Sequence, residues 1–247
     1  MISRFFCPSP LVFGAPVELP AEVAHHAVNV LKVGAGDTAI LFDGRGGEWL
    51  ATLSPSGKSS KPTLLATLTE FNERDNEAPL PITLVQALPA SDKMDWVVQK
   101  AVELGVARIQ PIMTKRSVMR LSGERAERRV THWRHIAIAA CEQSGRNRVP
   151  TVAPIIELPR YLGEVAERAE GCRFICAPGA TQSLRNRQAP TLPIALLVGP
   201  EGGFEESELS AAIIAGFEPI RLGPRVLRTE TAGVAALAAI MALWGDL

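Results

Sequence analysis

Two glycine-rich turns near the C-terminus limit the possible folds of this chain more than any other feature. They occupy residues 197–204 and 222–232. Each follows a short apolar, strand-like run, at 194–198 and 217–222, and each precedes a helical pattern. Open α/β sheets bind small molecules at such turns, where the carboxyl ends of parallel strands lead into helices. The pair of turns therefore predicts an α/β domain with a ligand site.

The alternation of strand-like and helical segments extends over the chain after Leu80. Strands are expected near residues 82–88, 109–113, 173–177, 194–198 and 219–222, and helices near 94–104, 124–144, 158–169, 205–215 and 232–244. Gly105 and Gly145 mark the ends of two of these helices. Such alternation predicts a parallel sheet covered by helices.

The N-terminal part of the sequence has a different pattern. Short β-rich runs alternate there with turn signals at residues 34–37, 43–47 and 54–57. This pattern is typical of a small β-barrel. Residues 70–79 are polar and lack periodicity, as expected of a linker. We therefore expect a β-barrel domain over residues 1–72 and an α/β domain over residues 73–247.

Length and hydropathy favour a globular protein without membrane segments. The chain has 247 residues, of which 47% are hydrophobic, so it can bury a substantial core. The longest apolar run, 234–244, is too short to cross a bilayer. Arg4 and Pro8 interrupt the N-terminus too early for a secretory signal. We expect a cytoplasmic protein with no membrane partner.

The cysteines and histidines do not predict a metal site. None of the four cysteines forms a Cys-x-x-Cys pair, and free, buried thiols are expected. His132 and His135 are three residues apart on an expected helix, but no third ligand follows at a suitable spacing. We expect no metal.

Basic residues are concentrated between residues 115 and 148. This segment has nine Lys or Arg residues and three Glu residues, whereas the whole chain has a net charge of zero. A stripe of this kind is typical of a nucleic-acid interface. It is equally typical of a solvated helix face with Glu–Arg pairs, and charge alone leaves both interpretations open.

The two turns match neither a phosphate loop nor the dinucleotide-binding fingerprint. Glycines 199, 202 and 203 would let the backbone approach a flat ring, and the leucines at 197, 222 and 227 would supply apolar walls. These properties suit an adenine. The glycines could instead only form tight turns, but two turns of similar pattern in one domain favour a ligand site.

The turns GPEGG at 199–203 and LGPRVLRTET at 222–231 together resemble the signature of the ribosomal RNA small-subunit methyltransferase E family. The segments at 93–105 and 136–150 resemble the first two helices of that family's catalytic domain. In the N-terminal part, His26, Val30-Leu31-Lys32, Gly36-Asp37 and Phe42-Asp43-Gly44 are similar to its PUA-like RNA-binding barrel. Lys32 stands where the family often has Arg; both are positively charged, but Lys cannot bind a phosphate bidentately.

The resemblance implies a SPOUT-class methyltransferase. Its α/β domain would tie a deep trefoil knot, bind S-adenosylmethionine in a bent form, and belong to a homodimer whose active site is completed across the subunit interface. The cofactor-binding residues implied by the match are Leu197, Val198, Gly199, Glu201, Gly202, Gly203, Leu222, Gly223, Val226, Leu227 and Arg228.

The implied reaction transfers a methyl group to N3 of a uridine in 16S ribosomal RNA. N3 of uracil is a weakly acidic imide, so its proton must leave before its lone pair can attack. Glu201 or Glu230 is a candidate base, and Arg228 a candidate stabiliser of the uracil anion. Glu230 would also suit a helix N-terminus without any catalytic role, Glu201 could only fix its turn, and Arg228 could hold a phosphate.

The expected partner is 16S rRNA or the small ribosomal subunit, with the target uridine unpaired so that N3 is accessible. The candidate RNA-binding residues are Arg4, Lys32, Arg45, Lys93, Arg116, Arg146, Asn147 and Arg148. Asn147 could equally be a helix-terminating turn residue. Three other functions remain: methylation of another RNA base or a ribose 2′-oxygen, RNA binding as a ribosome-assembly factor without catalysis, and metabolism of another adenine nucleotide.

Overall fold

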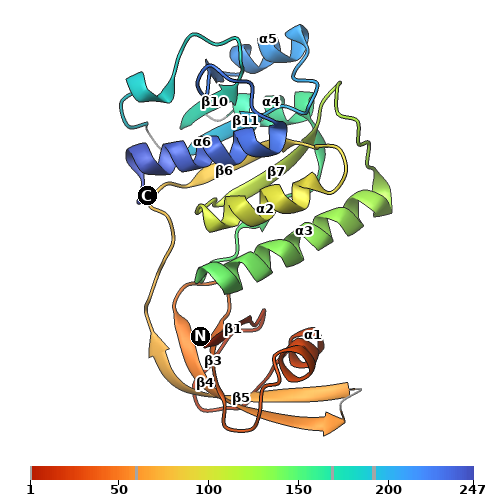
Figure 1. Cartoon of the computed structure of the whole chain (residues 1–247), viewed down its shortest axis with the longest axis vertical. Coiled ribbons are helices and arrows are strands. Elements are labelled where there is room, and N and C mark those ends of the chain that lie inside the picture. Colours follow the sequence, from red (N-terminus) through yellow and green to blue (C-terminus); the bar gives the residue numbers. More distant parts are fainter. Residues whose placement is uncertain (1, 59–60, 168–169, 191–192) are drawn as a thin grey trace. The chain divides into compact units, whose positions relative to one another are not determined.

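A computed structural model of the chain describes residues 2–58, 61–167, 170–190 and 193–247. It divides into two compact units, which are described separately (Figure 1). The N-terminal unit contains Met1–Glu77 together with Cys141–Val149, and the C-terminal unit contains Ala78–Ala140 together with Pro150–Leu247. The segment Cys141–Val149 thus belongs to the unit formed by the start of the chain, which its position in the sequence does not indicate. The expected boundary after residue 72 stays a prediction.

The N-terminal unit is built on a five-stranded sheet in the order β1-β3-β4-β5-β2. Its strands are β1 (Ser3–Phe6), β2 (Val17–Glu18), β3 (Thr38–Phe42), β4 (Glu48–Lys58) and β5 (Lys61–Asn72). A short helix α1 (Ala21–His25) continues into a π-helical segment, η1 (His26–Val30). Each of the three long strands places a leucine in the core: Leu41 of β3, Leu53 of β4 and Leu64 of β5 are fully buried. This is expected for strands with one apolar face.

Residues 54–57 lie within β4, although their composition predicts a turn. Pro55 pairs with Leu64 of β5 in a long hairpin. On the β3 side, the backbone of β4 is hydrogen-bonded as far as Leu53, which bonds to Gly36 and Asp37, and in the described residues this edge is free at Pro55. A proline is tolerated at a free edge because it leaves no ladder hydrogen bond unmade. The turn prediction was therefore wrong.

The C-terminal unit is an α/β domain with a parallel sheet in the order β12-β10-β11-β6-β7-β8, and β9 also pairs with β7. The strands are β6 (Ile82–Ala87), β7 (Arg108–Met113), β8 (Thr151–Val152), β9 (Ile156–Glu157), β10 (Cys172–Cys176), β11 (Ile194–Val198) and β12 (Glu218–Ile220). The helices are α2 (Lys93–Glu103), α3 (Gly123–Ser144), α4 (Leu158–Ala166), α5 (Glu206–Ile214) and α6 (Thr229–Trp244), with a short 3₁₀ turn η2 at Leu184–Asn186. The last turn of α3, from Cys141, is assigned to the N-terminal unit. The predicted α/β class is confirmed.

Helices cover both faces of this sheet. Val85 and Leu197 pack in one core cluster with residues of α4 and α5. Gly233 of α6 lies against Leu84 and Val198 on the opposite face, and α6 packs beside α2 (Figure 1). Because both faces are buried, the strands read as almost continuous apolar runs.

Two helix ends differ from expectation. Helix α6 begins at Thr229, three residues before the predicted start, because extended backbone at Arg228 ends the preceding turn. Helix α4 ends at Ala166, and residues 168–169, which were expected to continue it, lie outside the described residues. No helix in the described ranges is both long enough and apolar enough to span a membrane.

Candidate active site

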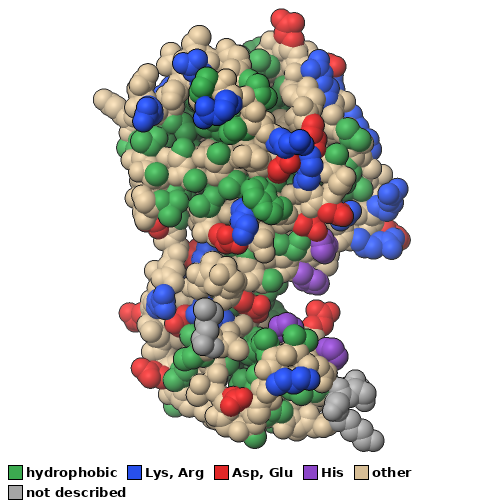
Figure 2. All heavy atoms as spheres, viewed as in Figure 1, with side chains coloured by type: hydrophobic (Ala, Val, Ile, Leu, Met, Phe, Trp, Pro, Cys, Tyr) green, Lys and Arg blue, Asp and Glu red, His purple; other side chains and the backbone are tan. Residues whose placement is uncertain are grey.

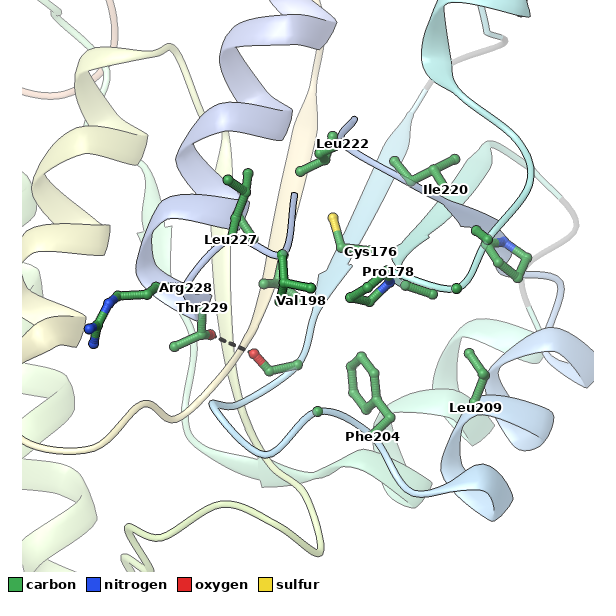
Figure 3. Close-up of a pocket in the computed structure, with 18 of the residues that line it drawn as sticks. Cys176, Pro178, Val198, Phe204, Leu209, Ile220, Leu222, Leu227, Arg228 and Thr229 are labelled. Atoms are coloured by element: carbon green, nitrogen blue, oxygen red, sulfur yellow. Dashed lines mark hydrogen bonds between the residues drawn. The ribbon is translucent and has the colours of Figure 1, made fainter. Parts of the chain in front are cut away.

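A pocket of about 1040 Å³ opens at the carboxyl ends of β10, β11 and β12 (Figure 3). The ends of these strands and the segments that follow them form its walls, namely residues 176–182, 198–204 and 219–229 without 221 and 224. Leu209 of α5 and Arg116, which follows β7, also contribute to its lining. Its position at this edge of a parallel sheet is the one that open α/β domains use for small ligands.

The structure brings together almost all of the residues implied as cofactor-binding. Those that line the pocket are Val198, Gly199, Glu201, Gly202, Gly203, Leu222, Gly223, Val226, Leu227 and Arg228. Leu197 does not line it. Its side chain is fully buried in the core with α4 and α5, because successive residues of a strand point to opposite faces of the sheet.

The segment from Cys176 to Gln182 forms one wall of the pocket and was missed from the sequence. The dipeptide Pro178-Gly179, directly after a predicted strand, is a turn signal that could have found it. In Figure 3, Cys176 and Pro178 lie opposite Leu227 across the pocket. Burial raises the pKa of the Cys176 thiol to about 12, so it stays protonated at neutral pH and does not compete as a nucleophile.

Two glycines of the turn after β11 are closely packed, and a third has a positive φ. A Cβ atom at Gly199 would lie 3.0 Å from the ring of Phe204, and one at Gly202 would lie 3.3 Å from Cβ of Arg116. Gly203 has a φ of 67°, in the left-handed region that favours glycine. These glycines therefore shape the turn itself, in addition to any approach by a ligand.

A buried hydroxyl group joins the two glycine-rich turns. Thr229, the first residue of α6, donates a hydrogen bond of 2.5 Å to the carbonyl of Gly199. Its Oγ1 also accepts a hydrogen bond of 2.9 Å from Nε2 of Gln86, a residue of β6 with no solvent exposure. The start of α6 is thus fixed to β6 and to the end of β11, and the pocket walls are held together.

Replacing Thr229 with valine is expected to lower the free energy of unfolding by about 1–3 kcal/mol, because the Gly199 carbonyl loses its buried donor while the shape is kept. The affinity for the pocket ligand should fall as well. Urea denaturation and calorimetric titration would measure the two effects. Thr229→Ser keeps the hydroxyl and should cost less than Thr229→Val; equal losses would show that the hydrogen bonds do not hold the turns together.

Lys93 lies between Glu201 and Glu230, the two carboxylates considered as bases. Its Nζ is 3.0 Å from Oε1 of Glu201 and 3.5 Å from Oε1 of Glu230. Glu201 also accepts a hydrogen bond of 3.0 Å from the backbone amide of Ala90. The second oxygen of Glu230 is buried and has no hydrogen-bond partner among the described residues. Glu201 lines the pocket and Glu230 does not.

The pKa of Glu201 lies below its ordinary value of 4.5. Burial alone raises it, but the hydrogen bond from Lys93 and those from the backbone amides of Glu201 and Ala90 outweigh burial. The hydrogen bond to Glu201 in turn raises the pKa of Lys93. Glu201 is therefore ionised and Lys93 protonated at neutral pH.

These shifts predict how stability depends on pH. A carboxyl whose pKa is lower in the folded than in the unfolded chain adds stability above its unfolded pKa, and this contribution disappears as the pH falls through the folded pKa. The difference in unfolding free energy between wild type and Glu201→Gln should be constant from about pH 6 to about pH 8. It should shrink once the pH falls below 4.5 in a urea denaturation series. A difference that stays constant in acid would contradict the assignment.

Arg228 lines the pocket at the extended residue before α6. Its guanidinium has no ion-pair partner in the part of the chain that the structure describes. In Figure 3 the side chain points away from the labelled apolar residues of the pocket. A cation in this position is available to a second ligand beside the pocket.

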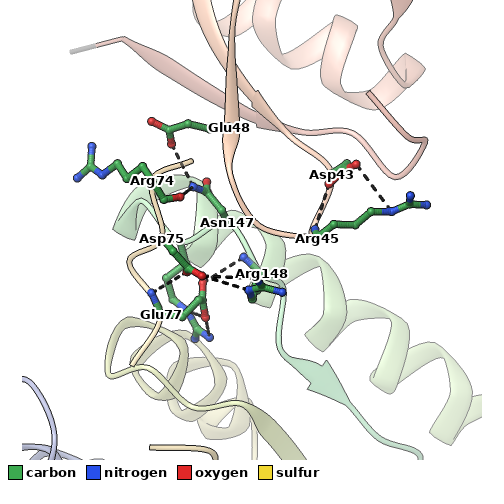
Figure 4. A network of polar contacts seen from close by, with 9 residues as sticks. Asp43, Arg45, Glu48, Arg74, Asp75, Glu77, Asn147 and Arg148 are labelled. Atoms are coloured by element: carbon green, nitrogen blue, oxygen red, sulfur yellow. Dashed lines mark hydrogen bonds and ion pairs between the residues drawn. The ribbon is translucent and has the colours of Figure 1, made fainter. Parts of the chain in front are cut away.

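Three of the residues predicted to contact RNA are instead parts of a polar network inside the N-terminal unit. Arg4 donates to Glu48 over 2.6 Å and to the side chain of Asn147. Asn147 is fully buried and donates to the backbone carbonyl of Arg74 (Figure 4). Arg146, which is 4% exposed, donates to Glu77. Direct RNA contact does not fit these positions because their polar groups face protein partners.

The other candidates are more exposed. Lys32, Arg45 and Arg148 lie on the surface of the N-terminal unit, and Lys32 has a positive φ of 58°. In the C-terminal unit, Arg116 donates a hydrogen bond of 3.0 Å to the carbonyl of Gly202, and Lys93 is held by its two glutamates. The basic residues between 115 and 148 largely form pairs with acids, such as Arg129 with Asp92. Figure 2 shows basic and acidic side chains interspersed on the visible face.

The described residues contain no group of three metal-ligating side chains that could hold an ion. Nε2 of His132 lies 2.8 Å from Oδ2 of Asp95, and the same carboxyl accepts a hydrogen bond from the indole of Trp133. These contacts give His132 a structural role in joining α3 to α2.

Comparison with known families supports the site. A model of the RNA methyltransferase domain matches residues 76–241, and a model of the RNA methyltransferase PUA domain matches residues 19–61. Ribosomal RNA small subunit methyltransferase E of Synechocystis sp. is 35% identical over 237 residues, which cover 94% of this chain and 75% of that protein. The chain belongs to the ribosomal RNA small subunit methyltransferase E family. The Bacillus subtilis member is 31% identical over 90% of this chain and 88% of its own length.

Solved structures agree with this family. A methyltransferase E from Neisseria gonorrhoeae bound to S-adenosyl methionine is 40% identical, with a TM-score of 0.91 and complete coverage of both chains. A Legionella pneumophila protein in complex with the same cofactor is 34% identical, with a TM-score of 0.94 and complete coverage. The protein is thus an rRNA methyltransferase, and its cofactor is S-adenosylmethionine.

The pocket of this methyltransferase fits that cofactor. Its volume matches the upper end of the range for small-molecule sites. Ile220, Leu222 and Leu227 would supply apolar contacts to the adenine ring. Gly179 and Gly223 have open space where a Cβ atom would stand. The backbone is therefore accessible to a ligand at both of these residues.

Proposed function

We propose that the protein transfers the methyl group of S-adenosylmethionine to N3 of a uridine in 16S rRNA, with the small ribosomal subunit as substrate. The observation that carries this proposal is the pocket formed by both glycine-rich turns in a chain of the methyltransferase E family. When bound there, the cofactor supplies an electrophilic methyl group. The chain's own residues must then provide for the uracil proton and the resulting negative charge.

Arg228 is the proposed stabiliser of the uracil anion. It lines the pocket and has no competing carboxylate among the described residues. A charge-assisted hydrogen bond from a guanidinium lowers the energy of the anion and hence the barrier to proton loss. Its alternative role, holding a substrate phosphate, would change RNA affinity rather than the chemical step.

Glu201 is the proposed proton acceptor, directly or through water, because it lines the pocket. Its lowered pKa makes it a weak base, so anion stabilisation by Arg228 must supply the larger part of the rate enhancement. Glu230 lies outside the pocket lining and shares Lys93 with Glu201. We assign it the role of keeping Lys93 in place, with catalysis by Glu230 as the alternative.

The active protein is proposed to be a cytoplasmic homodimer with a knotted C-terminal domain, as the family implies. Val226, at the rim of the pocket, supports a pocket that a second subunit completes, since this apolar side chain is 78% exposed. Lys32, Arg45, Arg116 and Arg148 are the proposed RNA contacts that remain accessible at the surface. The target uridine must be unpaired when methylated, because pairing hides N3.

The test is transfer of labelled methyl groups to small subunits that lack the modification, followed by mass spectrometry of the nucleosides. Labelled 3-methyluridine is the expected product. Another methylated base, or a ribose-methylated nucleotide that resists alkaline cleavage, would assign a different substrate to the same fold and cofactor. Tight cofactor binding without transfer to either subunits or naked 16S rRNA would favour an assembly factor.

A further inference from the structure

The N-terminal unit carries a second pocket, with a volume of about 350 Å³, that the methyl-transfer chemistry does not use. The indole of Trp49 and the ring of Phe71 form its aromatic wall, and the turn at 43–47 between β3 and β4 forms its rim. We propose that this pocket binds one unpaired nucleotide of the RNA substrate, with the base stacked on the aromatic wall and the phosphate held by Arg45 and Arg148. This inference rests on the proposed function, because it takes RNA as the substrate.

The two rings of the aromatic wall belong to a cluster of three. The centroids of Trp49 and Phe71 are 4.9 Å apart with their planes tilted by 52°, and Phe13 stacks on Trp49 at 6.0 Å with an interplanar angle of 16°. Phe13 is 65% exposed and Phe71 46% exposed. Exposed aromatic rings that gather in one patch mark an interaction site, and a nucleic-acid base presents a flat face of matching size.

The turn beside this wall is shaped by two glycines with positive φ, 102° at Gly46 and 69° at Gly47. A Cβ atom at Gly47 would clash with Phe71, only 2.4 Å from its Cζ. The edge of the Phe71 ring can therefore approach the turn only because residue 47 has no side chain. At Gly46 the guanidinium of Arg148 lies directly against the backbone.

Two arginines at the rim provide the charge for a phosphate. The Arg45 side chain is 69% exposed and lies 3.8 Å from Asp43, while Arg148 lies 3.5 Å from Asp75 (Figure 4). The Arg148–Asp75 pair is exposed on both sides, and a pair of this length contributes little, so a phosphate can replace Asp75 at small cost. The Asp43 side chain is only 15% exposed and stays in place, so a phosphate would bind the exposed face of Arg45. An apolar peptide would use the rings but not the arginines, which favours a nucleotide as the occupant.

The test compares Phe71→Leu with Phe71→Tyr in the full-length protein. Fluorescence anisotropy would measure affinity for a labelled single-stranded RNA of about 12 nucleotides. Leucine keeps the apolar volume but removes the stacking face, so affinity should fall by about five- to a hundredfold. Tyrosine keeps the face and should bind within about twofold of wild type. The matched control is Leu65→Ala on the same strand, an exposed apolar residue outside the pocket, which should also bind like wild type.

Cofactor affinity should be the same in all of these variants. Equal RNA affinity of Phe71→Leu and wild type would overturn the inference. Normal binding of Phe71→Leu to naked RNA with reduced affinity for small subunits would also overturn it, because the pocket would then bind a ribosomal protein. Product analysis with wild-type protein tests the proposed function separately: absence of 3-methyluridine would reject that function, whereas the RNA affinities would still decide whether the pocket binds a nucleotide.

Discussion

Replacing Arg228 with alanine is expected to lower the rate of methyl transfer by about 100- to 1000-fold, the size of effect seen when one preorganised donor to a developing anion is lost. The affinity for S-adenosylmethionine should change only a few-fold, since the pocket is formed mainly by backbone and apolar side chains from three strand ends. Single-turnover methylation of small subunits and calorimetric titration of the cofactor would measure the two quantities separately.

Arg228→Lys separates charge from geometry. Lysine keeps the positive charge but loses the planar guanidinium, so an intermediate rate is expected. Arg221→Ala is a matched control, because Arg221 is exposed on the same segment and does not line the pocket. A parallel loss of turnover and cofactor affinity in Arg228→Ala would assign this residue to cofactor binding. A loss of RNA affinity with an unchanged single-turnover rate would assign it to a substrate phosphate.

Replacing Arg146 with alanine should lower the free energy of unfolding by about 3–5 kcal/mol, because it leaves the Glu77 carboxylate without its guanidinium partner. The Arg146 side chain is 5% exposed, and Glu77 is also largely buried. Urea denaturation followed by circular dichroism would measure this change. The result would identify Arg146 as a structural residue.

Arg148→Ala is the comparison for this variant. Arg148 lies two residues further along, but its side chain is mostly exposed and its pair with Asp75 is long. Its removal should cost less than about 1 kcal/mol in stability while weakening RNA binding. If Arg146→Ala were as stable as Arg148→Ala and lost RNA affinity instead, the buried network would not describe Arg146 in solution.

The parts of the site that the sequence predicted depend on local chemistry. The turns at 199–203 and 222–228 could be recognised because two turns of similar pattern follow strands of one domain, and the structure places both at one pocket. The parallel sheet was also predicted from local patterns. Each strand and helix after Leu80 has its own periodicity of apolar residues, and their alternation indicated the sheet that the structure contains.

The parts that the sequence did not predict depend on contacts between distant residues. Arg4 and Asn147 are separated by 143 positions, and nothing near either residue shows that they meet. A basic residue in a loop has the same local appearance whether it faces RNA or a buried glutamate. The strand at 54–57 was missed in the same way, because its pairing with β5 outweighs the preference of its residues for a turn.

The N-terminal unit is made of two separate segments of the chain, and this affects the order of folding during synthesis. Asn147 hydrogen-bonds to Glu48, and Glu142 accepts a hydrogen bond from the backbone amide of Phe6, so this unit needs residues made about seventy positions after its last strand. The first 77 residues cannot complete their polar interior when they leave the ribosome. They must wait for the polypeptide to reach residue 149, and a fragment cut after the last strand would expose charged groups that the finished protein keeps buried.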